Sequence, residues 1–128
     1  MKSLLVKLSP LVCMLGISAT ANADFREVWT CTINEGKTMD DVRAANSRWV
    51  KFINANVDGG GITSHIVTSV VGNASIGSFG YVDSFPTLES WSAAKSATEG
   101  NEEGEAIDEA LGEAAECSEN RLFEAEES

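Results

Sequence analysis

The amino-acid sequence predicts a small α+β domain whose strands and helices follow the order βαββαβ. Three observations favour this fold class. Segments rich in Val, Ile, Thr and aromatic residues alternate with segments whose apolar residues recur at helical spacing. Turn sequences that contain Gly, Asn and Pro separate these segments. Two cysteines, Cys31 and Cys117, fall near the first and last expected strands, which lie side by side in such a fold.

The first 23 residues have the organisation of a secretory signal peptide. Lys2 and Lys7 precede an apolar run, 8–17, and the segment closes with Ala21-Asn22-Ala23. The apolar run is too short to remain in a bilayer as a spanning helix. We therefore expect cleavage after Ala23, which leaves one mature domain, 24–128, that is periplasmic or secreted and has no membrane attachment.

The mature chain is strongly acidic. Removal of the two N-terminal lysines leaves 7 basic against 20 acidic residues, a formal charge of −13. A nucleic-acid partner is excluded because the phosphate backbone would be repelled. Many acidic residues lie after position 99, where they indicate a solvated helix face and tail. The stretch 99–105 lacks the spacing of an EF-hand, so no calcium site is expected there. No other metal site and no cofactor are expected.

The cysteine pair that remains after export predicts a structural disulfide. Cys13 leaves with the signal peptide, and Cys31 and Cys117 are the two that stay. In an oxidising compartment an isolated pair most simply forms a disulfide. A redox-active or metal-binding pair is disfavoured, because the chain has no C-x-x-C motif and His65 is its one histidine.

The first half of the domain predicts a strand, a helix and a hairpin. The strand runs over 25–34 and the helix begins at Thr38, with Asp41 as a weak form of the capping box. Glycines in 56–61 end the helix. A strand over 62–71, a turn over 72–75 and a strand over 76–83 form the hairpin. The helix gathers on one side Val42, Ala45, Trp49, Phe52 and Ile53.

The second half predicts two helical segments and a last strand. Pro86 and Thr87 open a helix that contains Trp91, and the glycines in 100–104 interrupt it. A further helix over 105–116 groups its apolar residues on one face. The strand over 118–125 follows, so Cys117 lies just before it, and the acidic end 126–128 is expected to fray.

Two β-α-β units joined by a hairpin define the split β-α-β, or ferredoxin-like, arrangement. Its antiparallel four-stranded sheet carries the helices on one face. The first strand lies antiparallel to the fourth, so the end of one adjoins the beginning of the other. The positions of Cys31 and Cys117 agree with this topology.

Two short motifs extend the comparison to a family. Thr32-Ile33-Asn34-Glu35-Gly36-Lys37 precedes an amphipathic helix, and Tyr81-Val82-Asp83-Ser84-Phe85 leads to a helix with Trp91. Over about 25–125 the chain resembles the dimeric α/β-barrel superfamily, most nearly its antibiotic-biosynthesis-monooxygenase and NIPSNAP-like group. The resemblance implies a homodimer whose two sheets face each other. It also implies space between sheet and helices for an aromatic or haem-like ligand. The export signal and the cysteine pair depart from the family pattern.

Four side chains are candidates for lining a ligand cavity. His65 alternates with Thr63, Val67 and Ser69 on a semi-polar strand face, from which an imidazole can relay a proton or ligate haem iron. Tyr81 and Phe79 share one face of the third strand, where they form either a cavity wall or a dimer contact. Trp29 lies either in the cavity wall or among the packing residues. If Cys117 lies on a loop, its bond to Cys31 does not show which face of the first strand is turned toward the helices. Trp49 and Trp91 are assigned to core packing.

No catalytic motif is present, and the catalytic residues are unknown. With one histidine and no nucleophile-elbow motif, hydrolase chemistry is excluded. The leading hypothesis is an exported homodimer that binds a small apolar or aromatic ligand without catalysis. One alternative is a cofactor-independent monooxygenase-like or isomerase-like enzyme in which His65 and Tyr81 handle protons. Another is an acidic protein-interaction module.

Overall fold

A computed structural model describes residues 24–128 of the chain. The predicted signal peptide, 1–23, lies outside the described residues. Within them no helix is long and apolar enough to cross a membrane. The elements in chain order are β1 (Asp24–Ile33), α1 (Met39–Asn56), β2 (Thr63–Val67), β3 (Ser78–Phe85), α2 (Leu88–Ala97), α3 (Glu102–Ala114) and β4 (Ala115–Ala125).

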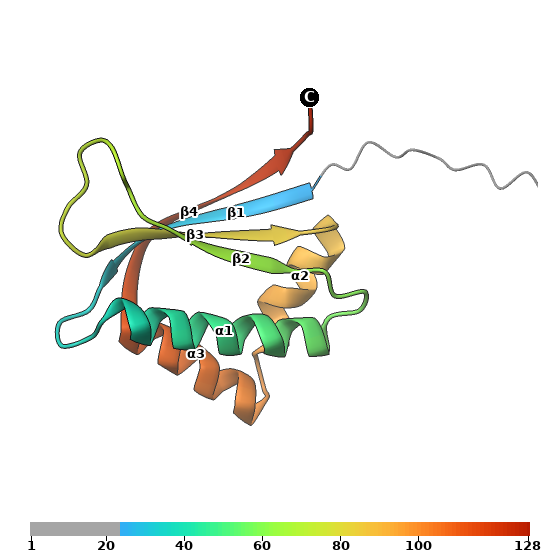
Figure 1. Cartoon of the computed structure of the whole chain (residues 1–128). Coiled ribbons are helices and arrows are strands. Elements are labelled where there is room, and N and C mark those ends of the chain that lie inside the picture. Colours follow the sequence, from blue (N-terminus) through green and yellow to red (C-terminus); the bar gives the residue numbers. More distant parts are fainter. Residues whose placement is uncertain (1–23) are drawn as a thin grey trace, which may run out of the picture.

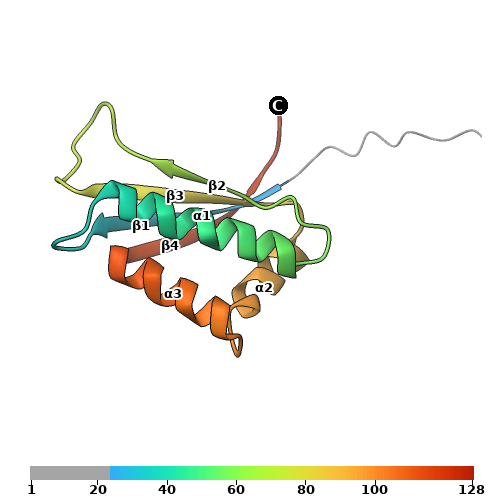
Figure 2. The ribbon, with the colours of Figure 1, turned by 60° about the horizontal axis from the view of Figure 1, so that its bottom comes forward.

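The four strands form one sheet in the order β2-β3-β1-β4, and every neighbouring pair is antiparallel. The three helices lie on one side of this sheet, with α1 and α3 next to each other (Figure 1, Figure 2). This is the predicted ferredoxin-like α+β fold. The predicted β2–β3 hairpin and the antiparallel pairing of the first and last strands are confirmed.

The two faces of the sheet differ in burial. Alternate residues of the central strands face the helices, and we call this side the inner face. The buried residues of the inner face include Glu27 and Cys31 of β1 and Phe79 and Phe85 of β3. Two clusters of buried side chains pack between the inner face and the helices. The opposite side, the open face, carries residues such as Val28, His65, Val82, Arg121 and Phe123.

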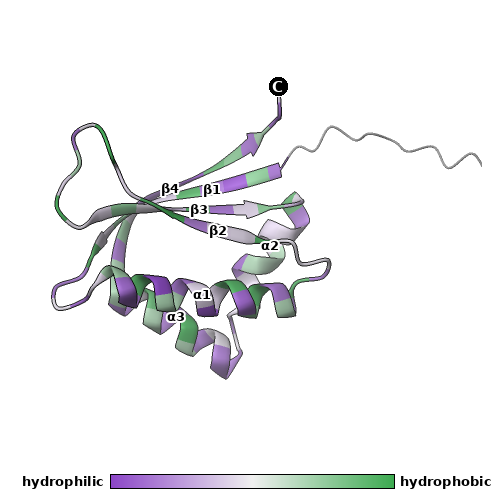
Figure 3. Ribbon diagram, viewed as in Figure 1, coloured by the Kyte–Doolittle hydropathy of each residue, from purple (hydrophilic) through white to green (hydrophobic). Residues whose placement is uncertain are grey.

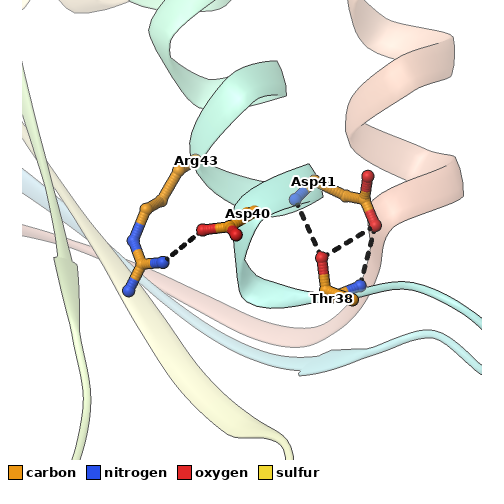
Figure 4. A network of polar contacts seen from close by, with 4 residues as sticks. All are labelled: Thr38, Asp40, Asp41 and Arg43. Carbon is orange, nitrogen blue, oxygen red and sulfur yellow. Dashed lines mark hydrogen bonds and ion pairs between the residues drawn. The ribbon is translucent and has the colours of Figure 1, made fainter.

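Helix α1 begins at the predicted capping box (Figure 4). The Thr38 amide donates to Asp41 Oδ2 at 2.8 Å, and the Asp41 amide donates to Thr38 Oγ1 at 3.4 Å. The hydrogen bond from the Thr38 backbone, followed by that from its side chain, lowers the pKa of Asp41. Asp40 and Arg43 pair nearby on the exposed surface at 2.8 Å, where such pairs contribute little to stability.

The hairpin is shorter than predicted. Strand β2 ends at Val67 instead of position 71, and β3 begins at Ser78 instead of 76, so 68–77 form a long connection. Figure 3 shows hydrophobic segments along this connection, and their side chains are almost fully exposed. An extended strand here would therefore gain no stability from burial. Those side chains are Val70, Val71 and Ile76.

The last helix and strand also have different bounds from those predicted. Asn101 caps α3 by accepting from the Gly104 amide at 3.0 Å, so the helix begins at Glu102 and includes a glycine that the sequence suggested as a break. Gly104 is required by close packing, because a Cβ there would lie 2.6 Å from Thr98 Cα. Strand β4 follows α3 directly, so Cys117 lies inside β4 and not on a loop before it.

The predicted disulfide between Cys31 and Cys117 is present and joins β1 to β4. The β1–β4 register shifts between Thr30, which pairs with Glu119, and Cys31, which pairs with Cys117. Ser118 is the extra residue of this bulge. Because a continuous register would place Ser118 opposite Cys31, the bulge brings the two cysteines together.

Replacement of both cysteines, C31A/C117A, should lower the free energy of unfolding by about 4 kcal/mol. The physical reason is that the disulfide joins residues with a sequence separation of 86 and so closes a long loop in the unfolded chain. Urea denaturation with and without a reducing agent measures the change. The double variant should be insensitive to the reducing agent. Equal midpoints for the oxidised and reduced unmodified protein would contradict the prediction.

Candidate functional site

A pocket of about 400 Å³ lies between the inner face and the helices. Its apolar walls come from Trp29 on β1, Trp49 on α1, and Tyr81 and Phe85 on β3. Its polar groups include Asp83 on β3 and Lys95 on α2. The volume and the mixture of aromatic walls with a few polar groups are typical of small-molecule sites.

The strand register explains why these side chains converge. Trp29 and Tyr81 are partners in the β1–β3 ladder, as are Glu27 and Asp83. Cross-strand partners lie on the same face of a sheet, so the two pairs form adjacent rows on the inner face. Aromatic and acidic groups therefore line one patch of sheet beneath α1, α2 and α3.

A buried carboxylate supports one wall of the pocket. Glu27 is fully buried, accepts from Trp91 Nε1 at 2.6 Å and forms an ion pair with Lys95. The Lys95 ammonium also lies 4.8 Å from the centre of the Trp29 ring. Because a buried carboxylate is strongly destabilising when unpaired, this arrangement keeps α2 against β1 and keeps Lys95 at the pocket.

The second carboxylate, Asp83, is held by a short hydrogen-bonded chain. Asn46 Nδ2 donates to Ser64 Oγ at 2.9 Å, and Ser64 Oγ donates to Asp83 Oδ1 at 2.5 Å. Burial raises the pKa of Asp83 to about 6; the Ser64 hydrogen bond opposes this, Glu27 adds to it, and Lys95 lowers it. Asp83 can therefore exchange a proton near neutral pH.

Tyr81 contributes a hydroxyl with no hydrogen-bond partner. Within residues 24–128 it is the one buried side-chain polar atom of this kind. Burial, with a smaller contribution from the charge of Asp83, raises the pKa of Tyr81 to about 12, so the hydroxyl stays protonated. Since buried polar atoms are nearly always paired, an unpartnered hydroxyl on a pocket wall is suited to a ligand's polar group.

The candidate residues from the sequence fall in different places. Trp29 and Tyr81 line the pocket. Phe79 packs edge-on against Tyr81, with ring centres 5.1 Å apart, but Phe79 does not line the pocket. His65 lies on the open face, because its antiparallel partner is Val82 and not an inner-face residue. Within one chain, His65 and Tyr81 therefore lie on opposite faces of the sheet. Ser69 lies beyond the end of β2.

Sequence reasoning missed the polar half of the site: Glu27, Asn46, Ser64, Asp83 and Lys95. A usable pattern was present for the two carboxylates. Each stands at an alternate position among apolar residues that face inward, Glu27 between Phe25 and Trp29, and Asp83 between Tyr81 and Phe85. Trp49, assigned to the core, packs there and also lines the pocket.

No group of three His, Cys, Asp or Glu side chains in the described part of the chain is arranged to hold a metal ion.

No protein-family model and no curated protein matches the chain. Several solved structures share its fold. SnoaB, a cofactor-independent oxygenase from Streptomyces nogalater, is 13% identical, with a TM-score of 0.59 and coverage of 83% of this chain and 96% of that one. A conserved protein of unknown function from Bacteroides thetaiotaomicron is 16% identical, with a TM-score of 0.54 and coverage of 82% and 100%.

A third structure belongs to a protein from Caulobacter crescentus with a provisional assignment as an antibiotic biosynthesis monooxygenase. It is 11% identical, with a TM-score of 0.54, and the match covers 84% of this chain and 92% of that one. At these identities the likeness concerns the fold. It agrees with the fold that the resemblance to the dimeric α/β-barrel superfamily implied.

Ionisation of Asp83 should destabilise the fold. The pKa of Asp83 is about 6 in the folded protein, against an ordinary value of 3.8. The protonated carboxyl therefore contributes stability that is fully present below pH 3.8. This contribution is lost as the pH rises through about 6. Asp83→Asn cannot ionise. Its free energy of unfolding, relative to the unmodified protein, should therefore rise by about 2–3 kcal/mol between pH 4 and pH 8.

Urea denaturation across this pH range measures the difference. Glu27, Lys95 and Tyr81 adjoin Asp83 and remain in both proteins, so the comparison isolates its titration. The exposed control, Asp58→Asn, should show a much smaller pH-dependent difference. A difference for Asp83→Asn that does not vary with pH would overturn the assignment.

Proposed function

We propose that the chain is an exported protein that binds a small aromatic or apolar molecule in the pocket between its sheet and helices. The observation that carries this proposal is an aromatic pocket of about 400 Å³ whose wall includes Tyr81, a residue with a buried hydroxyl that has no hydrogen-bond partner within residues 24–128. The aromatic walls favour a flat apolar body, and the hydroxyl favours a ligand with at least one hydrogen-bonding group.

Export is supported by the disulfide and by the first 23 residues. A disulfide between β1 and β4 fits an oxidising compartment. The organisation of the predicted signal peptide favours the periplasm or the exterior, with cleavage after Ala23.

A catalytic role is the second candidate, and Asp83 is the observation that favours it. A carboxylate with a pKa of about 6 in a buried pocket is suited to act as a general base near neutral pH. Tyr81 could then donate a hydrogen bond to the anion that forms. Proton abstraction that is lost in Asp83→Asn but kept in His65→Ala would distinguish this role from binding alone.

Self-association through the open face is part of the proposed function. The exposed face of α3 is strongly acidic, because its 13 residues carry six exposed carboxylates and no basic residue. The open face instead combines Arg26 and Arg121 with Glu116 and Glu119, and includes exposed apolar Phe123. Two copies of a chain of charge −13 should therefore repel each other less through this mixed face than through α3.

Tyr81→Phe should weaken binding of 2-naphthol about tenfold, because the ligand hydroxyl loses its hydrogen bond to Tyr81, and should leave naphthalene binding nearly unchanged. NMR titration of the oxidised protein measures both affinities. Naphthalene serves as the matched control because it lacks the hydroxyl. Failure of both ligands to bind would contradict the proposed binding function, and equal affinities in the two proteins would contradict the role of Tyr81.

Phe123→Glu should convert a dimer to a monomer, because it places a charge in the proposed interface. Sedimentation analysis measures the molecular mass. Leu88→Glu is the matched control: Leu88 and Phe123 are both 47% exposed, but Leu88 begins α2, on the helix side of the sheet. A monomeric unmodified protein, or equal dissociation in both variants, would refute the interface and would move the search to other protein partners.

A further inference from the structure

The charges at the pocket do not balance. Lys95 is the one basic residue among the described side chains that line it, and Glu27 already pairs with this lysine. Two further carboxylates line the pocket, Asp83 on β3 and Asp108 on α3. The pair formed by Glu27 and Lys95 is neutral as a unit, so the surplus formal charge is negative.

The aromatic walls have a matching electrostatic preference. The faces of indole and phenol rings carry partial negative charge and attract organic cations. Trp29 already shows this contact within the protein, with the Lys95 ammonium 4.8 Å from its ring centre. Trp49 and Tyr81 line the same pocket. Aromatic faces beside carboxylates are the combination that recognises an ammonium group.

We propose that the pocket selects protonated arylalkylamines, which carry an alkylammonium group on an aromatic ring system. The ring would lie among Trp29, Trp49 and Phe85, and the ammonium group would lie at Asp83 and Tyr81. The inference rests on the proposed function, because it assigns a ligand class to the same pocket.

The hydrogen-bonding groups fit this ligand. An ammonium group is a donor and lacks an acceptor. Asp83 accepts, and Ser64 fixes the position of its Oδ1. The Tyr81 hydroxyl oxygen, which has no partner in the fold, can accept as well. An ammonium ion at Asp83 also offsets the burial that disfavours the ionised carboxyl, so ligand and carboxylate stabilise each other in their charged forms.

An anionic ligand fits less well. It would lie near Asp83 and Asp108, and the nearby cation, Lys95, is already committed to Glu27. The Lys95 ammonium has further donors, but Glu27 already offsets its charge, so it offers an anionic ligand little net attraction. The net charge of the mature chain, −13, also draws cations toward the protein and repels anions.

Three probes that share one ring test the inference: tryptamine, which is cationic, 3-methylindole, which is neutral, and indole-3-acetate, which is anionic. Calorimetric titration of the oxidised protein should show tryptamine binding at least tenfold more tightly than indole-3-acetate, with 3-methylindole between them. Asp83→Asn should weaken tryptamine binding about tenfold and leave 3-methylindole binding unchanged. Asp58→Asn, which changes the net charge equally at an exposed position, should leave all three affinities nearly unchanged.

The outcomes separate the two proposals. If 3-methylindole binds but indole-3-acetate binds as tightly as tryptamine, the ammonium preference is overturned and the pocket function stands. If none of the three binds, the proposed pocket function fails, and the ligand class fails with it. The comparison of probes on the unmodified protein needs no variant, so it remains decisive even if Asp83→Asn does not fold.

Discussion

The structure depends on one buried charge. Glu27 projects from the central strand β1 into the interface between sheet and helices, where water cannot reach it. A carboxylate in that position must be paired, and both its partners, Trp91 and Lys95, come from α2. This requirement sets the position of α2 on the sheet, brings Lys95 over the Trp29 ring, and thereby defines one side of the pocket.

The second carboxylate acquires a different character from its surroundings. Asp83 lies opposite Glu27 in the β1–β3 strand register. Its side chain accepts a hydrogen bond from the neutral Ser64 hydroxyl. Burial and the neighbouring negative charge then favour its protonated form. The two acids on this patch of sheet therefore differ: Glu27 is paired with side chains of α2, whereas Asp83 lines the pocket and, among the described residues, has no basic partner of its own.

The opposite side of the pocket is set by the connection from α3 to β4. Strand β4 follows α3 without a loop, and the bulge at Ser118 brings Cys117 opposite Cys31. Cys117 lines the pocket, so the disulfide that links β1 to β4 also borders the binding space. Gly104 permits the close approach of α3 to the end of α2, which completes the helical layer.

Local patterns in the sequence determined most of the fold. Some features depend on neighbours within a few residues and could therefore be predicted: the capping box at Thr38, the apolar stripe of α1 and the alternation of the strands. The pairing of Cys31 with Cys117 could also be predicted, because these two cysteines remain after export. Two of the residues that line the pocket, Trp29 and Tyr81, were also candidates from the sequence. The tertiary structure alone decided which face each strand turns to the helices, and it therefore separated His65 from Tyr81 and joined Glu27 to Lys95 across 68 positions. Such contacts arise from long-range register and packing, which no short stretch of sequence encodes.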